Sequence, residues 1–91
     1  MFDDVTGAID VRITVKFFAI VRDRAGTAQA ELDLGDGATV SDAAAALADR
    51  FGAIADSLPR AAFAVNQNYA SKETILNDGD ELAVIPPVSG G

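Results

Sequence analysis

The chain has 91 residues, of which 49% are hydrophobic and 23% are charged. This composition is typical of one small globular domain and not of a disordered chain. Fourteen acidic and seven basic side chains leave a formal net charge of −7, which disfavours nucleic acid and anionic membranes as partners and favours a partner with a basic surface. The sequence contains no Cys and no His, which excludes nucleophilic catalysis by these residues and ordinary zinc sites.

Residues 1–10 show no hydrophobic period, and we expect them to form a loose leader ahead of the domain. They carry three acids and no base, unlike a secretory signal. The longest apolar runs, such as residues 17–21, are far too short to span a membrane. We therefore expect a cytoplasmic protein.

Residues 11–17 alternate between apolar and polar side chains, which predicts a half-buried strand. The predicted buried face of this strand consists of Val11, Ile13, Val15, Phe17 and Ala19. Residues 23–26 are typical of a turn, and the alternation over residues 30–34 predicts a second strand. Together these segments predict a β-hairpin.

A capping signal opens the next element, because Thr39 is followed three positions later by Asp42 and then by an alanine-rich stretch. The apolar residues that share one helical face are Val40, Ala43, Ala44, Leu47 and Phe51. Gly52 stands where a C-terminal cap is expected. The pattern predicts one amphipathic helix.

The second half of the chain has shorter elements. Residues 52–60 form a connection in which residues 55–57 could make a turn of helix before Pro59. Residues 62–66 predict a third strand, and a polar turn at 66–68 leads the chain towards Tyr69 and Ala70. Another turn at 77–80 precedes the alternating residues 81–85, and Pro86 and Pro87 end that last strand because proline cannot extend a central strand.

A hairpin, a helix and then short strands predict an α+β roll with a mixed sheet and one main helix packed on one face. This is the β-grasp, or ubiquitin-like, architecture, in which the last strand can lie beside the first. We assign the β-grasp domain to residues 11–87 and a flexible C-terminal Gly-Gly tail to residues 88–91.

Three stretches carry a family resemblance: FFAIVRD at residues 17–23, AVNQNYAS at 64–71 and LNDGDELAVIPPVSGG at 76–91. They resemble the small subunits of molybdopterin synthase, which are β-grasp sulfur carriers of molybdenum-cofactor biosynthesis. The resemblance runs from Val11 to Gly91. A terminal Gly-Gly alone marks any ubiquitin-like carrier, whereas a strand that leads into PPVSGG is much more specific.

The resemblance implies a chemical role for the chain terminus. The carboxylate of Gly91 would be adenylated by an ATP-dependent activating enzyme and converted to a thiocarboxylate. The thiocarboxylate would then donate sulfur to cyclic pyranopterin monophosphate in the large synthase subunit, within an expected heterotetramer. The chain itself would bind no cofactor and would be a sulfur donor with no catalytic activity alone. Val88, Ser89 and Gly90 would form the slim tail that brings Gly91 into both enzymes, because glycine lacks a Cβ.

The same resemblance nominates partner-binding residues. Phe18 is out of phase with the buried face of the first strand, and Ile85 is out of phase with Leu82 and Val84 in the last. We expect Phe18 and Ile85 to form an exposed apolar patch at the root of the tail. The remaining residues of this predicted docking surface are Tyr69, Pro86 and Pro87. The alternative for Phe18 is a second small core under a loop.

Two polar clusters allow more than one interpretation. Asp78, Asp80 and Glu81 could suggest a metal site, but an acidic turn between strands explains them as well. Arg22 and Arg24 could hold a phosphate or a partner's carboxylate, or they could be solvated or paired with nearby acids such as Asp23.

Two other functions remain open from the sequence. The chain could carry sulfur for thiamine, cysteine or tRNA thiolation, with a different acceptor enzyme. It could also be a ubiquitin-like modifier whose Gly91 is joined to lysines of target proteins.

Overall fold

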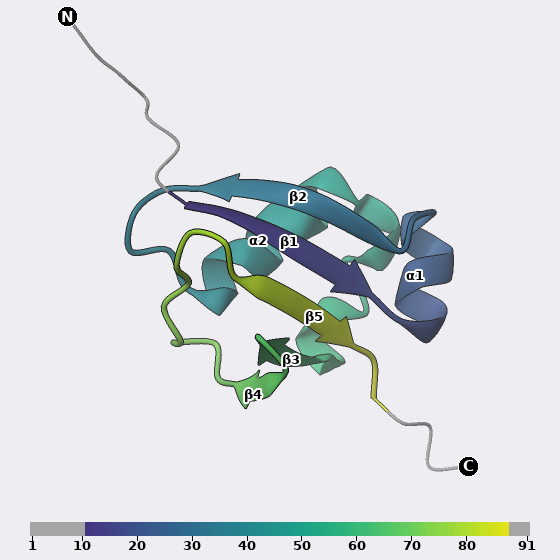
Figure 1. Cartoon of the computed structure of the whole chain (residues 1–91). Helices are drawn as coiled ribbons and strands as arrows, with labels where there is room; N and C mark the ends of the chain where they lie inside the picture. The colour runs from purple at the N-terminus through teal and green to yellow at the C-terminus, as the bar shows by residue number, and fades with distance from the viewer. Residues whose placement is uncertain (1–10, 88–91) are drawn as a thin grey trace, which may run out of the picture.

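The computed structural model describes residues 11–87; the predicted leader (1–10) and the predicted tail (88–91) lie outside the described residues. Within them, five strands form one mixed sheet in the order β2-β1-β5-β3-β4 (Figure 1). The strands are β1 (Val11–Phe17), β2 (Gln29–Leu34), β3 (Ala62–Val65), β4 (Asn68–Ala70) and β5 (Glu81–Ile85). The helices are α1 (Ala19–Ala25) and α2 (Val40–Arg50), followed by the 3₁₀ turns η2 (Gly52–Ile54) and η3 (Leu58–Arg60).

The strand pairing confirms the predicted β-grasp topology. β1 runs antiparallel to β2, with Val11 opposite Leu34. It runs parallel to β5, with Val15 opposite Leu82, so the last strand does lie beside the first. β5 in turn pairs antiparallel with β3. The parallel contact between β1 and β5 requires a crossover, and α2 lies in that connection.

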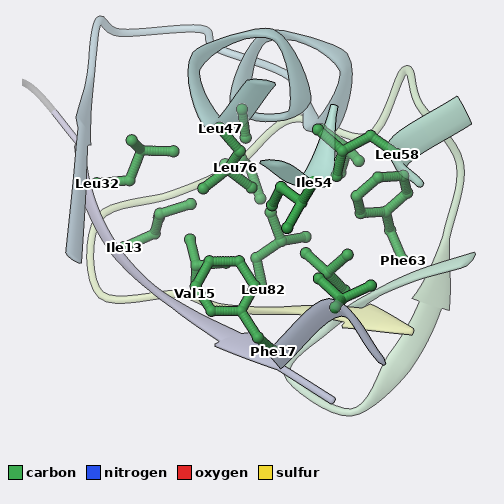
Figure 2. Packing of buried hydrophobic residues seen from close by; sticks show 14 of the residues in the cluster. Ile13, Val15, Phe17, Leu32, Leu47, Ile54, Leu58, Phe63, Leu76 and Leu82 are labelled. Carbon is green, nitrogen blue, oxygen red and sulfur yellow. The ribbon is translucent and has the colours of Figure 1, made fainter. Parts of the chain in front are cut away.

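The hydrophobic core lies between α2 and one face of the sheet (Figure 2). The alternation predicted for β1 is confirmed, because Val11, Ile13, Val15 and Phe17 are all buried. The residues that α2 and β5 contribute to the same core are Val40, Ala43, Leu47, Leu82 and Val84. A fully buried side chain of this size stabilises the fold by about 1.5–3 kcal/mol.

The start of α2 is as predicted, but its end is not. Thr39 accepts a hydrogen bond from the backbone N–H of Asp42, and Asp42 accepts one from that of Thr39, which completes a capping box. At the other end, Gly52 is not the cap, because the cap residue is Phe51 and Gly52 opens η2. The ring of Phe51 packs edge-on against Phe17 with 5.3 Å between centroids. The helix therefore ends one residue before the glycine, at a residue whose ring contacts the core.

The predicted turn at residues 23–26 is wrong, since α1 occupies this region. Phe18 is the last extended residue and caps α1, while Ala19 is exposed with a φ of 52°, so Ala19 does not belong to the buried face of β1. The helix buries Val21 completely. Gly26 ends α1 with a φ of 79°, a left-handed conformation that glycine adopts without strain. β1 and β2 therefore pair as a hairpin, but a helix joins them.

The second half of the chain follows the prediction more closely. The helical turn predicted around residues 55–57 lies between the 3₁₀ turns η2 and η3, where Ala55 and Ser57 have right-handed helical φ and ψ and the Ser57 N–H donates to the carbonyl of Ile54. Asn66 and Gln67 both have positive φ and join β3 to β4 in a two-residue turn, as hairpins of this kind require. β5 has the predicted bounds. No helix within residues 11–87 is long and apolar enough to cross a membrane.

Candidate functional site

The face of the sheet opposite α2 carries a hollow of about 440 Å³ with an apolar lining. The residues around it, here called the apolar patch, are Phe18, Ala64, Gln67, Tyr69, Ala83 and Ile85. The structure thus brings Phe18, Tyr69 and Ile85 together, although they lie far apart in the sequence.

Strand register explains how the apolar patch is built. Ala83, Ala64 and Tyr69 lie in one row across β5, β3 and β4. The two alanines form a low floor, of which Ala64 is only 6% exposed. Ile85 extends the floor towards the end of β5, because its side chain has the opposite phase to the buried Leu82 and Val84.

The rim of the apolar patch is aromatic and accessible. Phe18 is 46% exposed and Tyr69 is 80% exposed, whereas Ile85 is half-buried. The exposure of Phe18 rules out the alternative in which this ring fills a second core under a loop. Two exposed rings around one hollow, in contrast to single scattered apolar residues, are typical of an interaction surface.

The apolar patch lies at the point where the chain leaves the sheet. β5 ends at Ile85, and the half-buried Pro86 and the exposed Pro87 follow. The predicted reactive residue Gly91 and the tail residues Val88, Ser89 and Gly90 lie outside the described residues. Four residues span at most about 14 Å.

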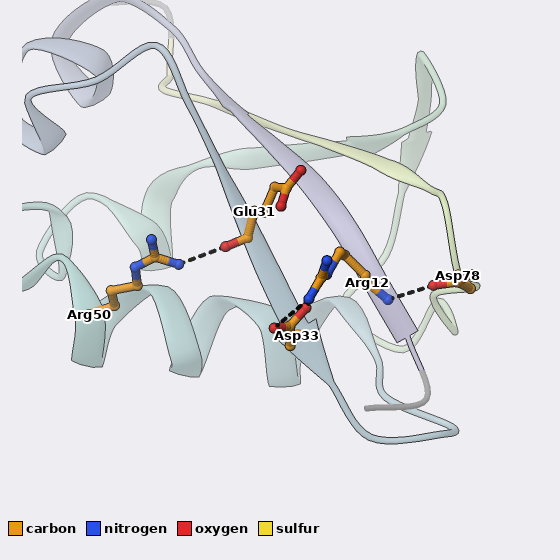
Figure 3. Close-up of polar contacts among 5 residues, drawn as sticks. All are labelled: Arg12, Glu31, Asp33, Arg50 and Asp78. Atoms are coloured by element: carbon orange, nitrogen blue, oxygen red, sulfur yellow. Dashed lines mark hydrogen bonds and ion pairs between the residues drawn. The ribbon is translucent and has the colours of Figure 1, made fainter. Parts of the chain in front are cut away.

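Arg12 near the start of β1 and Arg50 at the end of α2 both have hydrogen-bond partners within the fold (Figure 3). Arg12 pairs with Asp33 at 2.7 Å, and its backbone N–H donates to Asp78 at 2.8 Å. Arg50 donates to the backbone carbonyl of Glu31 at 2.6 Å. These contacts hold the turn before β5 and the outer strand β2 in place.

The acidic turn before β5 has a structural role. Asp78 accepts the hydrogen bond from Arg12 just described, while Asp80 accepts from the backbone N–H of Asn77 and from the side chain of Asn66. Glu81 forms an ion pair with Lys16 at 3.2 Å. These contacts favour the interpretation of Asp78, Asp80 and Glu81 as a turn that orients β5.

The ion pair between Arg12 and Asp33 should contribute to the stability of the fold against acid. The hydrogen bond from Arg12, together with its charge, holds the pKa of Asp33 below its usual range. Stability from a carboxylate with a lowered pKa is present above the unfolded-state value and is lost as the pH falls through the folded-state value. We expect Arg12→Gln to move the midpoint of acid unfolding, followed by circular dichroism, to higher pH. In an Asp33→Asn background the same change should have no further effect on the midpoint.

The sequence analysis missed part of the apolar patch. Ala64 and Gln67 were not predicted to belong to it, although Phe63 is a large apolar residue that predicts an inward side chain and so an outward Ala64. The side chains of Arg22 and Arg24 make no ion pair with Asp23 among the described residues. Arg24 lines a second hollow, which is described below.

Comparison with known proteins identifies the family. A model of the ThiS family matches residues 15–91, a range that includes the apolar patch and the chain terminus. The chain belongs to the ThiS family. This membership agrees with the sulfur-carrier resemblance seen in the sequence.

Individual members of the ThiS family match over their whole length. The chain is 39% identical over 83 residues to the molybdopterin synthase sulfur carrier subunit of Chlamydomonas reinhardtii, covering 89% of this chain and 100% of the relative. Among solved structures, a putative molybdopterin converting factor, subunit 1, from Pyrococcus furiosus is similar with a TM-score of 0.79 and 32% identity, over 86% of this chain and 99% of that one.

SAMP1 from Haloferax volcanii, a small archaeal modifier protein, is similar with a TM-score of 0.81 and 31% identity, over 88% of this chain and 99% of that one. Both structural matches confirm the predicted β-grasp fold.

Proposed function

We propose that this chain is the sulfur carrier subunit of a molybdopterin synthase. The observation that carries the proposal is the match to a relative of that name over the relative's full length. The geometry supports it, because the chain leaves the rigid strand β5 beside an exposed apolar patch. A carrier of this kind needs these two features: a surface that docks, and a chain end that reaches from it.

The chemistry of the carrier resides in the carboxylate of Gly91. A carboxylate is a poor electrophile, so an activating enzyme first joins it to the AMP portion of ATP, and pyrophosphate leaves. A sulfur nucleophile then attacks the carbonyl carbon of Gly91 and displaces AMP, which produces the thiocarboxylate. The chain has no Cys, so the terminus is the place where it can carry transferable sulfur.

The apolar patch has the role of a docking surface in this scheme. Phe18, Tyr69 and Ile85 would be buried against the large synthase subunit, while Pro86 and Pro87 stiffen the root of the tail. Docking turns delivery of the sulfur into a step within one complex, in which the reacting atoms are already close. The chain would contribute no catalytic group besides its terminus.

A reconstituted assay tests this function. The thiocarboxylated chain and the large subunit of the same organism are mixed with cyclic pyranopterin monophosphate, and molybdopterin is measured. We expect molybdopterin to form in proportion to the thiocarboxylate consumed. Consumption of the thiocarboxylate without molybdopterin, or no consumption at all, would contradict the proposal.

A second candidate function is supported by the similarity to the small archaeal modifier protein 1 of Haloferax volcanii. A modifier would join Gly91 to lysine side chains of other proteins. Extracts of cells that express a tagged chain distinguish the two functions. Conjugates of higher mass that require Gly91 would support the modifier, whereas a carrier remains at its own mass.

A further inference from the structure

A second hollow lies at the same end of the molecule as the apolar patch. This hollow, here called the arginine groove, has a volume of about 210 Å³ and lies between α1, the segment that includes η3, and the start of the tail. Its basic side chains are Arg24 from α1 and Arg60 from η3. The residues that complete the lining are Ile20, Asp56, Ser57, Pro86 and Pro87.

The two arginines differ from three other basic residues of the fold, which have partners within it. Arg12 and Lys16 are held in ion pairs, and Arg50 donates to a backbone carbonyl. In contrast, the side chains of Arg24 and Arg60 make no hydrogen bond or ion pair within residues 11–87. Both are exposed in a chain whose formal net charge is −7. The two guanidinium groups outnumber the one carboxylate of the lining, Asp56, so the groove is a local positive feature on an acidic protein.

Consecutive residues at the root of the tail line the two hollows. Ile85 lines the apolar patch, while Pro86 and Pro87 line the arginine groove. A partner that encloses the emerging tail would contact both hollows at once. Contacts on both sides fix the direction in which the tail enters, which an apolar contact alone does not do.

We propose that the arginine groove binds carboxylate side chains of the large synthase subunit, at the mouth through which the tail enters. This inference rests on the proposed function. Guanidinium groups recognise carboxylates through paired hydrogen bonds, and Arg24 and Arg60 have all their side-chain donors available among the described residues.

A nucleotide phosphate is the other anion that could fill the arginine groove. The nucleotide of an activated carrier is joined to the chain end, four residues beyond Pro87. An extended tail of this length places that phosphate up to about 14 Å away from the root. The contiguity of the groove with the apolar patch instead favours a protein surface as the occupant.

Charge reversal tests the proposal with a matched control. Arg24→Glu, Arg60→Glu and Lys72→Glu change the net charge equally, but Lys72 lines a different hollow beside α2. We expect the first two to lower the association rate with the large subunit about tenfold at low salt, because attraction becomes repulsion at the interface. The difference in association rate between these two variants and the parent chain should shrink at high salt, where the charges are screened. Lys72→Glu should have a much smaller effect.

One further variant and one control measurement make the outcome decisive. Arg60→Gln removes the charge without reversing it and should give an intermediate rate, and the thermal unfolding of every variant should match that of the parent because the altered side chains are exposed. If Arg24→Glu and Arg60→Glu associate as fast as Lys72→Glu, the proposed role of the arginine groove is contradicted. The proposed function of the chain is unaffected by that result. A defect confined to adenylation of Gly91 would assign the groove to a nucleotide phosphate and also contradict its proposed role. Failure of the parent chain to bind the large subunit would contradict the proposed function and this inference together.

Discussion

Removal of Gly90 and Gly91 is expected to abolish molybdopterin formation in the reconstituted assay. The truncated chain keeps every residue of the core and of the apolar patch, so its free energy of unfolding should change by no more than about 0.5 kcal/mol. It loses the carboxylate that carries sulfur. Thermal unfolding and the assay are measured on the same preparation. Molybdopterin formation by the truncated chain would contradict the carrier function.

Two variants of the tail test separately whether the chain next to the carboxylate must be narrow and whether the carboxylate must lie at a fixed distance from the domain. Gly90→Val keeps the carboxylate but adds a β-branched side chain that restricts φ and ψ and widens the chain. One residue added after Gly91 keeps the width but moves the carboxylate by about 3.3–3.6 Å. Both should bind the large subunit normally in calorimetry and fail to form thiocarboxylate. Normal thiocarboxylate formation by Gly90→Val would mean that no narrow passage admits this tail.

A charge in the apolar patch is expected to weaken binding to the large subunit about 30-fold or more, which corresponds to about 2 kcal/mol. Tyr69→Glu and Ile85→Glu both place an unpaired charge within an apolar contact, where desolvation of the charge opposes binding. Titration calorimetry with the purified large subunit measures the dissociation constant.

Ile75→Glu is the matched control for these substitutions, because Ile75 is 58% exposed and does not line the apolar patch. It should bind the large subunit as the parent chain does. Tyr69 is 80% exposed, so a binding defect in Tyr69→Glu cannot result from a damaged core. Parent-like affinity in both patch variants would exclude the apolar patch as the docking surface.

Where sequence and structure agree, the signals are local and strong. The alternation in β1 and β5, the proline pair after Ile85 and the capping residues Thr39 and Asp42 each depend on a few neighbouring residues. These features could therefore be predicted from the sequence together with the β-grasp topology.

Where the prediction fails, the outcome depends on contacts between distant segments. α1 has only two turns, too few for a clear helical period, and it forms because Val21 can enter the core. α2 ends at Phe51, one residue before the glycine, and the ring of Phe51 packs against Phe17 from a distant part of the chain. The arginine groove combines three segments of the chain, so its composition could not be read from any one of them.

The mass of the intact chain tests the central claim most directly. The purified chain is incubated with the activating enzyme, ATP and a sulfur source, and its mass is measured before and after. We predict an increase equal to the replacement of one oxygen by one sulfur, located at Gly91 by fragmentation and absent when ATP is omitted. An unchanged mass with an activating enzyme that is active on another carrier would contradict the account.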